Sequence, residues 1–176
     1  MTVWLAGGIA LSVAFWIAFV LLRRRFEASP SQALAAAVQV GPAGLLSVAP
    51  WRSVLDPTYI GYSLGVLRFP GRTASLPATL VLLSLLVSAW ILLRFRGGRP
   101  YAVPAIVNLL FALNLGLGML GGEAPRFQLG EHLTLTGAPA LALELVLLVL
   151  PFLLVAAWCV RRGVWGHDGG ADDLNA

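Results

Sequence analysis

The sequence contains no lysine, a single cysteine, two histidines and few charged residues of either sign. Charged side chains make up 11% of the chain, whereas an average soluble domain has about 25%. This shortage excludes an ordinary cytosolic domain, a disordered chain and a nucleic-acid-binding domain, although 12 arginines against 8 acidic residues give a net charge of +4. The arginines stand at the ends of apolar runs, as expected of a membrane protein.

The scarcity of metal-binding and redox-active side chains limits the chemistry that the chain can perform. Cys159 alone excludes an internal disulfide, a CxxC pair and an iron–sulfur cluster ligated by this chain only. His132 and His167 lie outside the apolar runs, which excludes bis-histidine haem ligation inside a membrane. The sequence has no Walker loop, GxSxG or HExxH motif and no aspartate in an apolar run. We therefore expect no cofactor and no metal.

Five apolar runs of roughly 18–23 residues occupy most of the chain. At 1.5 Å per residue they match a hydrocarbon core of about 30 Å, and unpaired backbone groups are not tolerated in lipid, so we expect helices. The prediction is an all-α integral membrane bundle of five transmembrane helices in one domain, 1–162, followed by a disordered cytoplasmic tail, 163–176. The spans are about 3–22, 33–50, 76–93, 101–120 and 138–160.

The arginines orient the bundle. No positive charge precedes the first run and Arg23, Arg24 and Arg25 follow it, so the run is not a cleavable signal peptide and the N-terminus is expected outside. If the weaker run 33–50 crosses, eight arginines fall inside and four outside; if it does not, the counts are seven and five. Five spans with the C-terminus inside fit better, which predicts a multi-pass protein of a bacterial-type inner membrane. The eight are Arg23, Arg24, Arg25, Arg94, Arg96, Arg99, Arg161 and Arg162.

Two outer connections are long enough to carry structure. Residues 51–75 contain aromatic and aliphatic residues between prolines, which indicates an interfacial or re-entrant segment. Residues 121–137 contain a short alternating stretch around Gly130-Glu131, and a glycine at the first turn position is typical of a two-residue type II′ hairpin.

The first span carries Ala6, Ala10, Ala14 and Ala18 at strict four-residue spacing. Small residues at this spacing let another helix approach closely. Two interpretations stay open: packing within the bundle, or docking onto a partner membrane protein.

The second span contains Gly41-Pro42 close to Gln39, near mid-membrane. Proline removes a backbone donor and clashes with the preceding turn. Broken helices at membrane depth line binding sites in many transporters, but proline kinks are also common in structural spans. A functional break and a packing kink are therefore both possible.

Glu144 is the one acidic residue inside any predicted span, and a carboxylate there is costly unless it is paired, protonated or near water. Counting residues from the outer ends of the spans puts Asn114 at the same depth, Ser84 slightly deeper and Gln39 close to the midplane. These four side chains could form one polar layer. Three interpretations stay open: the layer joins helices, it binds an ion, proton or small polar ligand, or it is catalytic or meets a partner subunit's charge. Asn108 and Ser88 form an uncharged match in the inner half, which we interpret as helix-joining.

The chain has few reactive groups and carries the alanine ladder. These two features predict a non-catalytic subunit or accessory protein of a larger membrane assembly, with the lipid bilayer and other membrane subunits as partners. A small-solute or lipid-binding carrier, with Glu144, Asn114 and Gln39 around its site, is the alternative. A third hypothesis is an outer-face membrane enzyme that uses Glu144, Glu131 and His132. Glu131 and His132 lie next to each other with no second histidine nearby, so they form a poor metal site.

Overall fold

The computed structural model describes residues 2–46, 61–64, 67–70, 75–121, 126–129 and 133–165. These residues form a helical bundle with two short hairpins. The helices are α1 (Thr2–Arg25), α2 (Pro30–Leu46), α4 (Ser75–Arg94), the 3₁₀ turn η2 (Arg99–Tyr101), α5 (Ala102–Leu120), α6 (Ala138–Glu144), the π-helical segment η3 (Leu145–Val149) and α7 (Leu150–Trp165).

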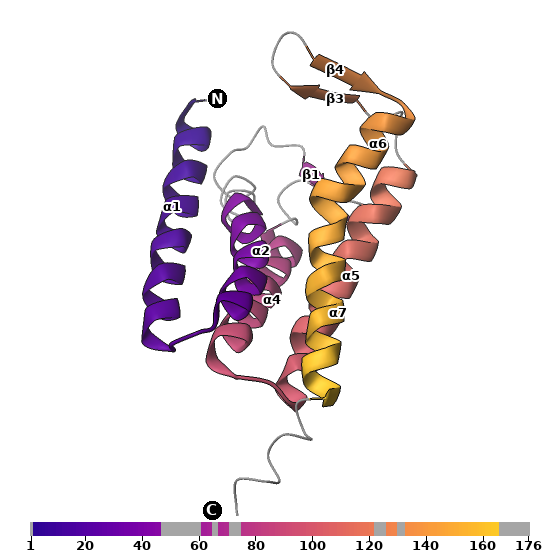
Figure 1. Cartoon of the computed structure of the whole chain (residues 1–176). Helices are drawn as coiled ribbons and strands as arrows, with labels where there is room; N and C mark the ends of the chain where they lie inside the picture. The colour runs from indigo at the N-terminus through magenta and orange to yellow at the C-terminus, as the bar shows by residue number, and fades with distance from the viewer. Residues whose placement is uncertain are drawn as a thin grey trace, which may run out of the picture.

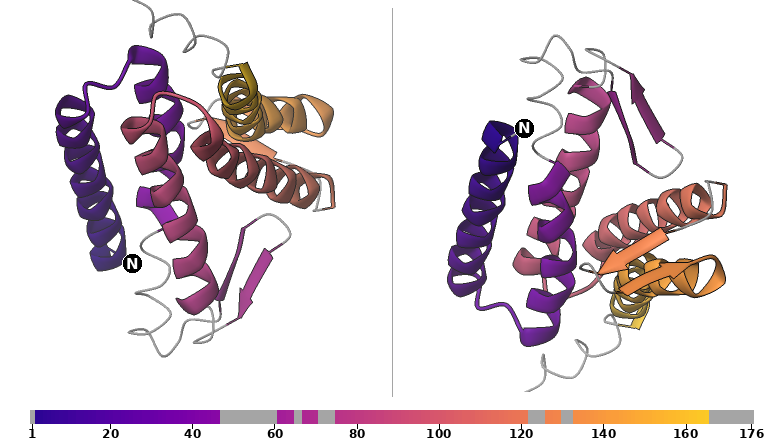
Figure 2. Two further views of the ribbon diagram at one scale, coloured as in Figure 1. Left: turned by 90° about the horizontal axis from the view of Figure 1, so that it is seen from below. Right: turned by 90° about the horizontal axis from the view of Figure 1, so that it is seen from above.

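The helices run up and down between two ends of the molecule (Figure 1). Helix α1 forms an outer layer against α2, α2 packs along α4, and α5 pairs with the continuous helix made by α6, η3 and α7 (Figure 2). Since consecutive helices are antiparallel, the chain passes five times between the two ends. This arrangement puts the two described hairpins at the end opposite to the short connections between helices.

Two helices in the described part of the chain are long and apolar enough to cross a membrane, judged by length and composition. They are Arg99–Leu120, with a mean hydropathy of 1.9, and Ala138–Gly163, with 2.7. The apolar helix Thr79–Arg94 is shorter. These helices give limited support for association with a membrane.

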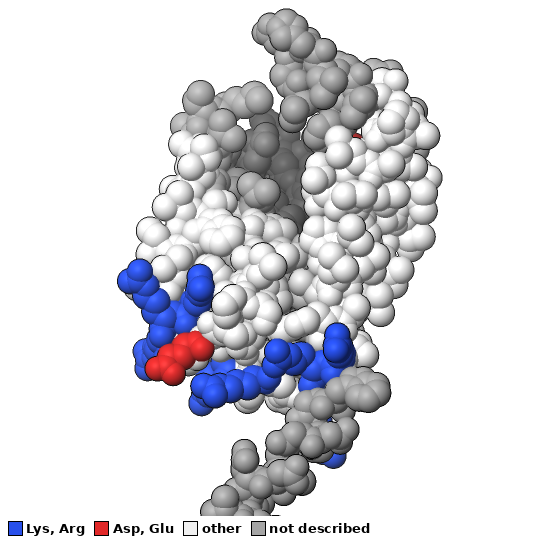
Figure 3. All heavy atoms as spheres, viewed as in Figure 1, with Lys and Arg blue, Asp and Glu red and all other residues white. Residues whose placement is uncertain are grey.

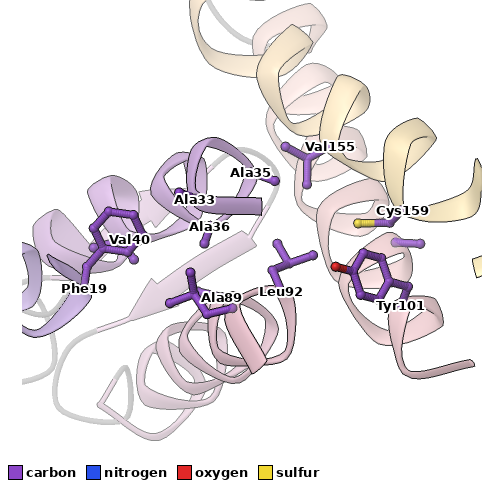
Figure 4. Close-up of a cluster of buried hydrophobic side chains, with 12 residues drawn as sticks. Phe19, Ala33, Ala35, Ala36, Val40, Ala89, Leu92, Tyr101, Val155 and Cys159 are labelled. Atoms are coloured by element: carbon purple, nitrogen blue, oxygen red, sulfur yellow. The ribbon is translucent and has the colours of Figure 1, made fainter. Parts of the chain in front are cut away.

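The core consists of two clusters of buried apolar side chains. The larger one joins α1, α2 and α4 to the start of α5 and the end of α7, with Tyr101 and Cys159 beside Leu92 (Figure 4). The second joins α2 and α4 to α5 and α7 and includes the ring contact between Phe111 and Phe152, whose centroids lie 4.7 Å apart. Helix α2 contributes mainly alanines to both clusters, and these short side chains let α4 approach closely.

The Gly-Pro segment of α2 is a packing surface in an unbroken helix. Helix α2 continues through Pro42 to Leu46. Gly41 faces the ring of Trp16, and Gly44 lies against Ser12 of α1. The small residues around Pro42 therefore bring α1 and α2 together, which supports the packing interpretation over a functional break.

The helix that follows the second hairpin changes its winding directly after Glu144. Residues Leu145–Val149 form a π turn, in which the Leu150 N–H donates to the Leu145 carbonyl. Pro151 follows; it has no N–H to donate and its ring displaces the carbonyl four residues earlier. This proline gives a physical reason for the wider turn, since π turns arise where the regular ladder is interrupted.

Two antiparallel hairpins lie in the long connections. Strands β1 (Gly61–Leu64) and β2 (Leu67–Pro70) occupy part of the segment 51–75 that we expect at an interface. Residues 51–60, 65–66 and 71–74 of this segment lie outside the described ones. Strands β3 (Arg126–Leu129) and β4 (Leu133–Thr136) confirm the hairpin predicted in 121–137. The predicted two-residue turn is wrong, because Leu129 pairs with Leu133 and three residues separate the strands.

The C-terminal end of the bundle differs slightly from the prediction. Helix α7 extends to Trp165, beyond the expected span end at 160, because Arg161 and Arg162 continue the last turns. Of the expected disordered tail, 163–176, residues 166–176 lie outside the described part of the chain.

Candidate functional site

One end of the bundle gathers the arginines that the sequence assigns to a single side (Figure 3). The Arg94 guanidinium lies over the ring of Phe26, 5.7 Å from its centre, which joins the ends of α1 and α4. The Gly98 N–H donates to the Arg162 carbonyl at 3.3 Å, which joins the α4–α5 turn to the end of α7. All eight arginines of the predicted inner set belong to these chain segments. We call this the arginine end.

A hydrogen-bonded clamp around Gln32 holds the arginine end together. The Gln32 side-chain nitrogen lies 3.1 Å from the Leu92 carbonyl, 2.6 Å from the Phe95 carbonyl and 3.1 Å from the Tyr101 hydroxyl. The Tyr101 hydroxyl donates to the same Phe95 carbonyl at 3.0 Å. The last carbonyls of a helix lack partners within it, so Gln32 completes the end of α4.

Gln32 also caps its own helix. The Ser29 N–H donates to Gln32 Oε1 at 2.9 Å, and the Gln32 N–H donates to Ser29 Oγ at 3.3 Å. This reciprocal pair is a capping box. The spacing Ser29-x-x-Gln32 directly before an apolar run is a signal that could have revealed Gln32, which our sequence analysis did not single out.

A second polar level lies two helical turns further into the bundle. Gln39, Ser88 and Asn108 are fully buried. Each lies seven residues from a member of the clamp: Gln39 from Gln32, Ser88 from Phe95 and Asn108 from Tyr101. Seven residues are about 10.5 Å along a helix and nearly two full turns, so each residue lies on nearly the same helix face as its clamp member. We call these three residues the buried polar level.

The buried polar level is short of hydrogen bonds within the described part of the chain. The Asn108 amide nitrogen donates to the Pro104 carbonyl at 2.7 Å. The Asn108 Oδ1, the Ser88 Oγ and both polar atoms of the Gln39 amide have no partner among the described residues. The spacing thus groups Gln39 with Ser88 and Asn108, whereas the sequence suggested a layer with Glu144.

The other residues of the predicted layer lie further from the arginine end. Phe111 faces Phe152, and a Cβ on Gly116 would lie 3.9 Å from Val149. This register places Asn114 level with about Leu150, so Glu144 lies six residues, or about 9 Å, further outward.

The sequence analysis expects Asn114 and Glu144 at the same depth, whereas the register of α5 and α7 places them at different depths. Glu144 and Asn114 are half-buried. The Ser84 hydroxyl donates to the Val81 carbonyl at 2.7 Å within its own helix. Ligand binding by Glu144, Asn114, Gln39 or Ser84 stays a prediction.

The alanine ladder of α1 is exposed. Ala6, Ala10, Ala14 and Ala18 are each exposed, while α1 packs on its neighbours through Ser12, Phe15 and Phe19. Packing against α2 therefore does not use the ladder. Its last member, Ala18, borders a small cavity of about 70 Å³ beside Leu86 and Trp90 of α4.

An apolar groove of about 410 Å³ runs between α2 and the helix formed by η3 and α7. Leu34 and Val38 line one wall; Val146, Leu154 and Trp158 line the other. Ser31 and Trp158 lie where the groove meets the arginine end, and the Arg162 guanidinium lies 5.5 Å from the centre of the Trp158 ring. We call this the α2–α7 groove.

Catalytic and metal chemistry gain no support from the described residues. Within them, no group of three or more His, Cys, Asp or Glu side chains could hold a metal ion. Glu131 and His132, which the enzyme hypothesis requires, lie outside the described part of the chain. Comparisons of the chain with protein-family models, with curated proteins and with solved structures find no match.

Proposed function

We propose that the chain is a multi-pass membrane protein with five transmembrane helices, its N-terminus outside and its C-terminus inside. The collection of eight arginines at one end of an up-and-down bundle supports this orientation, because arginines in short connections favour the cytoplasmic side. Large apolar side chains also cover the outside of the helices: Ile9, Leu110 and Leu154 are each more than half exposed. Such a surface suits lipid or partner helices better than water.

Within that membrane the protein acts as a non-catalytic subunit or accessory component of a larger assembly. The observation that carries this proposal is the exposed ladder Ala6, Ala10, Ala14 and Ala18 on the outermost helix. Helix α1 packs mainly against α2, so within the described part of the chain the flank with the ladder is open to a further helix. Small residues on such a flank permit close packing between membrane helices.

The test is co-purification from the native membrane in mild detergent. Ala14→Leu adds bulk to the ladder, so we expect the partner protein to be lost while the variant itself remains folded. Ile9→Leu, on a different exposed flank of α1, is the control and should keep the partner. A pure monomer from the native host, without any partner, would contradict the proposal.

A carrier for a small solute or lipid is a second candidate. It is favoured by the fully buried Gln39 amide, whose polar atoms have no partner among the described residues; an unsatisfied buried amide is costly. Glu144→Gln and Gln39→Leu should then abolish binding or transport without loss of expression. Normal transport in both variants would exclude this candidate.

A further inference from the structure

We propose that the α2–α7 groove binds one acyl chain of an anionic phospholipid, whose phosphate lies beside Arg162. The inference rests on the membrane placement proposed above. It adds a specific lipid to the partners of the chain and assigns a role to a groove that neither core packing nor the alanine ladder explains.

The length of the groove matches one leaflet of a bilayer. Its lining extends from Trp158 to Val146, twelve residues or about 18 Å along the helix. Half of a hydrocarbon core of about 30 Å is about 15 Å. The groove therefore begins at the arginine end and reaches about as far as an acyl chain of the leaflet on that side.

The lining of the groove suits a hydrocarbon chain. Apart from Ser31 at the end, the lining consists of apolar residues and Trp158, which offers hydrocarbon contacts along its whole length.

The charge at the mouth of the groove favours an anionic headgroup. The Arg162 guanidinium stacks over Trp158, which itself lines the groove, and its positive charge is thereby held where a phosphate would sit. Glu27 is the one acidic residue among the described residues of the arginine end, against eight arginines. Counting also the three aspartates that follow Trp165 in the sequence, this end keeps a net charge of +4. Basic sites between membrane helices bind anionic lipid headgroups.

Native mass spectrometry of the full chain tests the proposal. The protein is released from mixed micelles that contain either phosphatidylglycerol or phosphatidylcholine, both with the same oleoyl chains. We expect a retained phosphatidylglycerol and little retained phosphatidylcholine. Arg162→Gln should reduce the preference about five-fold, since one arginine near a lipid headgroup contributes about that factor. Arg24→Gln removes the same charge at the end of α1 and should leave the preference unchanged.

A second pair of variants tests the acyl-chain site. Leu154→Trp fills the groove and should abolish retention of both lipids, whereas Leu110→Trp, equally exposed at 60% but on α5, should not. Equal retention of the two lipids, retention of neither, or a second polypeptide bound in place of lipid would overturn the proposal. A failure of the proposed function would give a different result. The protein would then purify without a partner or show a reversed topology, while the retention of lipid could still be measured.

Discussion

Gly44 of α2 lies so close to α1 that a Cβ built on it would stand 2.7 Å from Oγ of Ser12 and 3.0 Å from its Cα. Contact with a backbone atom at this distance leaves no room for a methyl group without moving one helix. The pair therefore fixes the spacing between α1 and the rest of the bundle. Gly41, one turn earlier, has more space, because its Cβ would lie 4.0 Å from the Trp16 ring.

Gly44→Ala should loosen α1, whereas Gly41→Ala should not. Alanine in a helix interior gains about 0.5–1 kcal/mol over glycine, and overpacking costs about 1–3 kcal/mol. We expect Gly41→Ala to raise the free energy of unfolding and Gly44→Ala to lower it. Denaturant titration of both variants in the same detergent measures the difference. Equal stability of the two variants would show that α1 does not approach α2 at Gly44.

Loss of the Gln32 clamp should destabilise the arginine end. Gln32→Glu keeps an acceptor for the Ser29 N–H but cannot donate to the Leu92 and Phe95 carbonyls. The Phe95 carbonyl keeps the Tyr101 hydroxyl as a donor, whereas the Leu92 carbonyl loses its side-chain donor. Leaving one buried acceptor unpaired costs about 1–3 kcal/mol, so Gln32→Glu should lower the free energy of unfolding by about that amount.

Ser31→Ala is the control for the clamp, since Ser31 is exposed and its side chain makes one exposed hydrogen bond among the described residues, with Ser29 Oγ at 3.1 Å. Thermal unfolding of both variants checks the prediction. Similar midpoints would show that Gln32 does not hold the helix ends.

Two serines of α4 should respond in opposite directions to alanine substitution. The Ser88 hydroxyl is buried without a partner among the described residues, so Ser88→Ala removes an unsatisfied group and should raise the free energy of unfolding by about 1 kcal/mol. The Ser84 hydroxyl donates to the Val81 carbonyl, so Ser84→Ala should be neutral or slightly destabilising. A clear loss of stability in Ser88→Ala would indicate that the buried polar level is satisfied by a bound molecule, in favour of the carrier.

Hydropathy and charge predict the order of the helices, and the second hairpin is also readable from its alternating residues. The contacts between helices are less accessible to sequence, because they depend on register. One-dimensional counting placed Asn114 level with Glu144, whereas the packing of Phe111 on Phe152 shifts the two apart. The Gln32 clamp was missed because Gln32 precedes the apolar run expected at 33–50, although its capping box is local. Whether the alanine ladder is buried or exposed depends on which face of α1 meets α2. The close contact between Ser12 and Gly44 determines that face.

We propose that the chain crosses the membrane five times, with the hairpins and the arginine end on opposite sides. Single cysteines at Glu27, Ser63, Arg96 and Gln128, in a Cys159→Ala background, can be labelled with a membrane-impermeant maleimide in intact and in opened cells. We predict that positions 63 and 128 react in intact cells and that positions 27 and 96 react only after opening. Reaction of positions 63 and 96 from the same side would contradict the five-span arrangement.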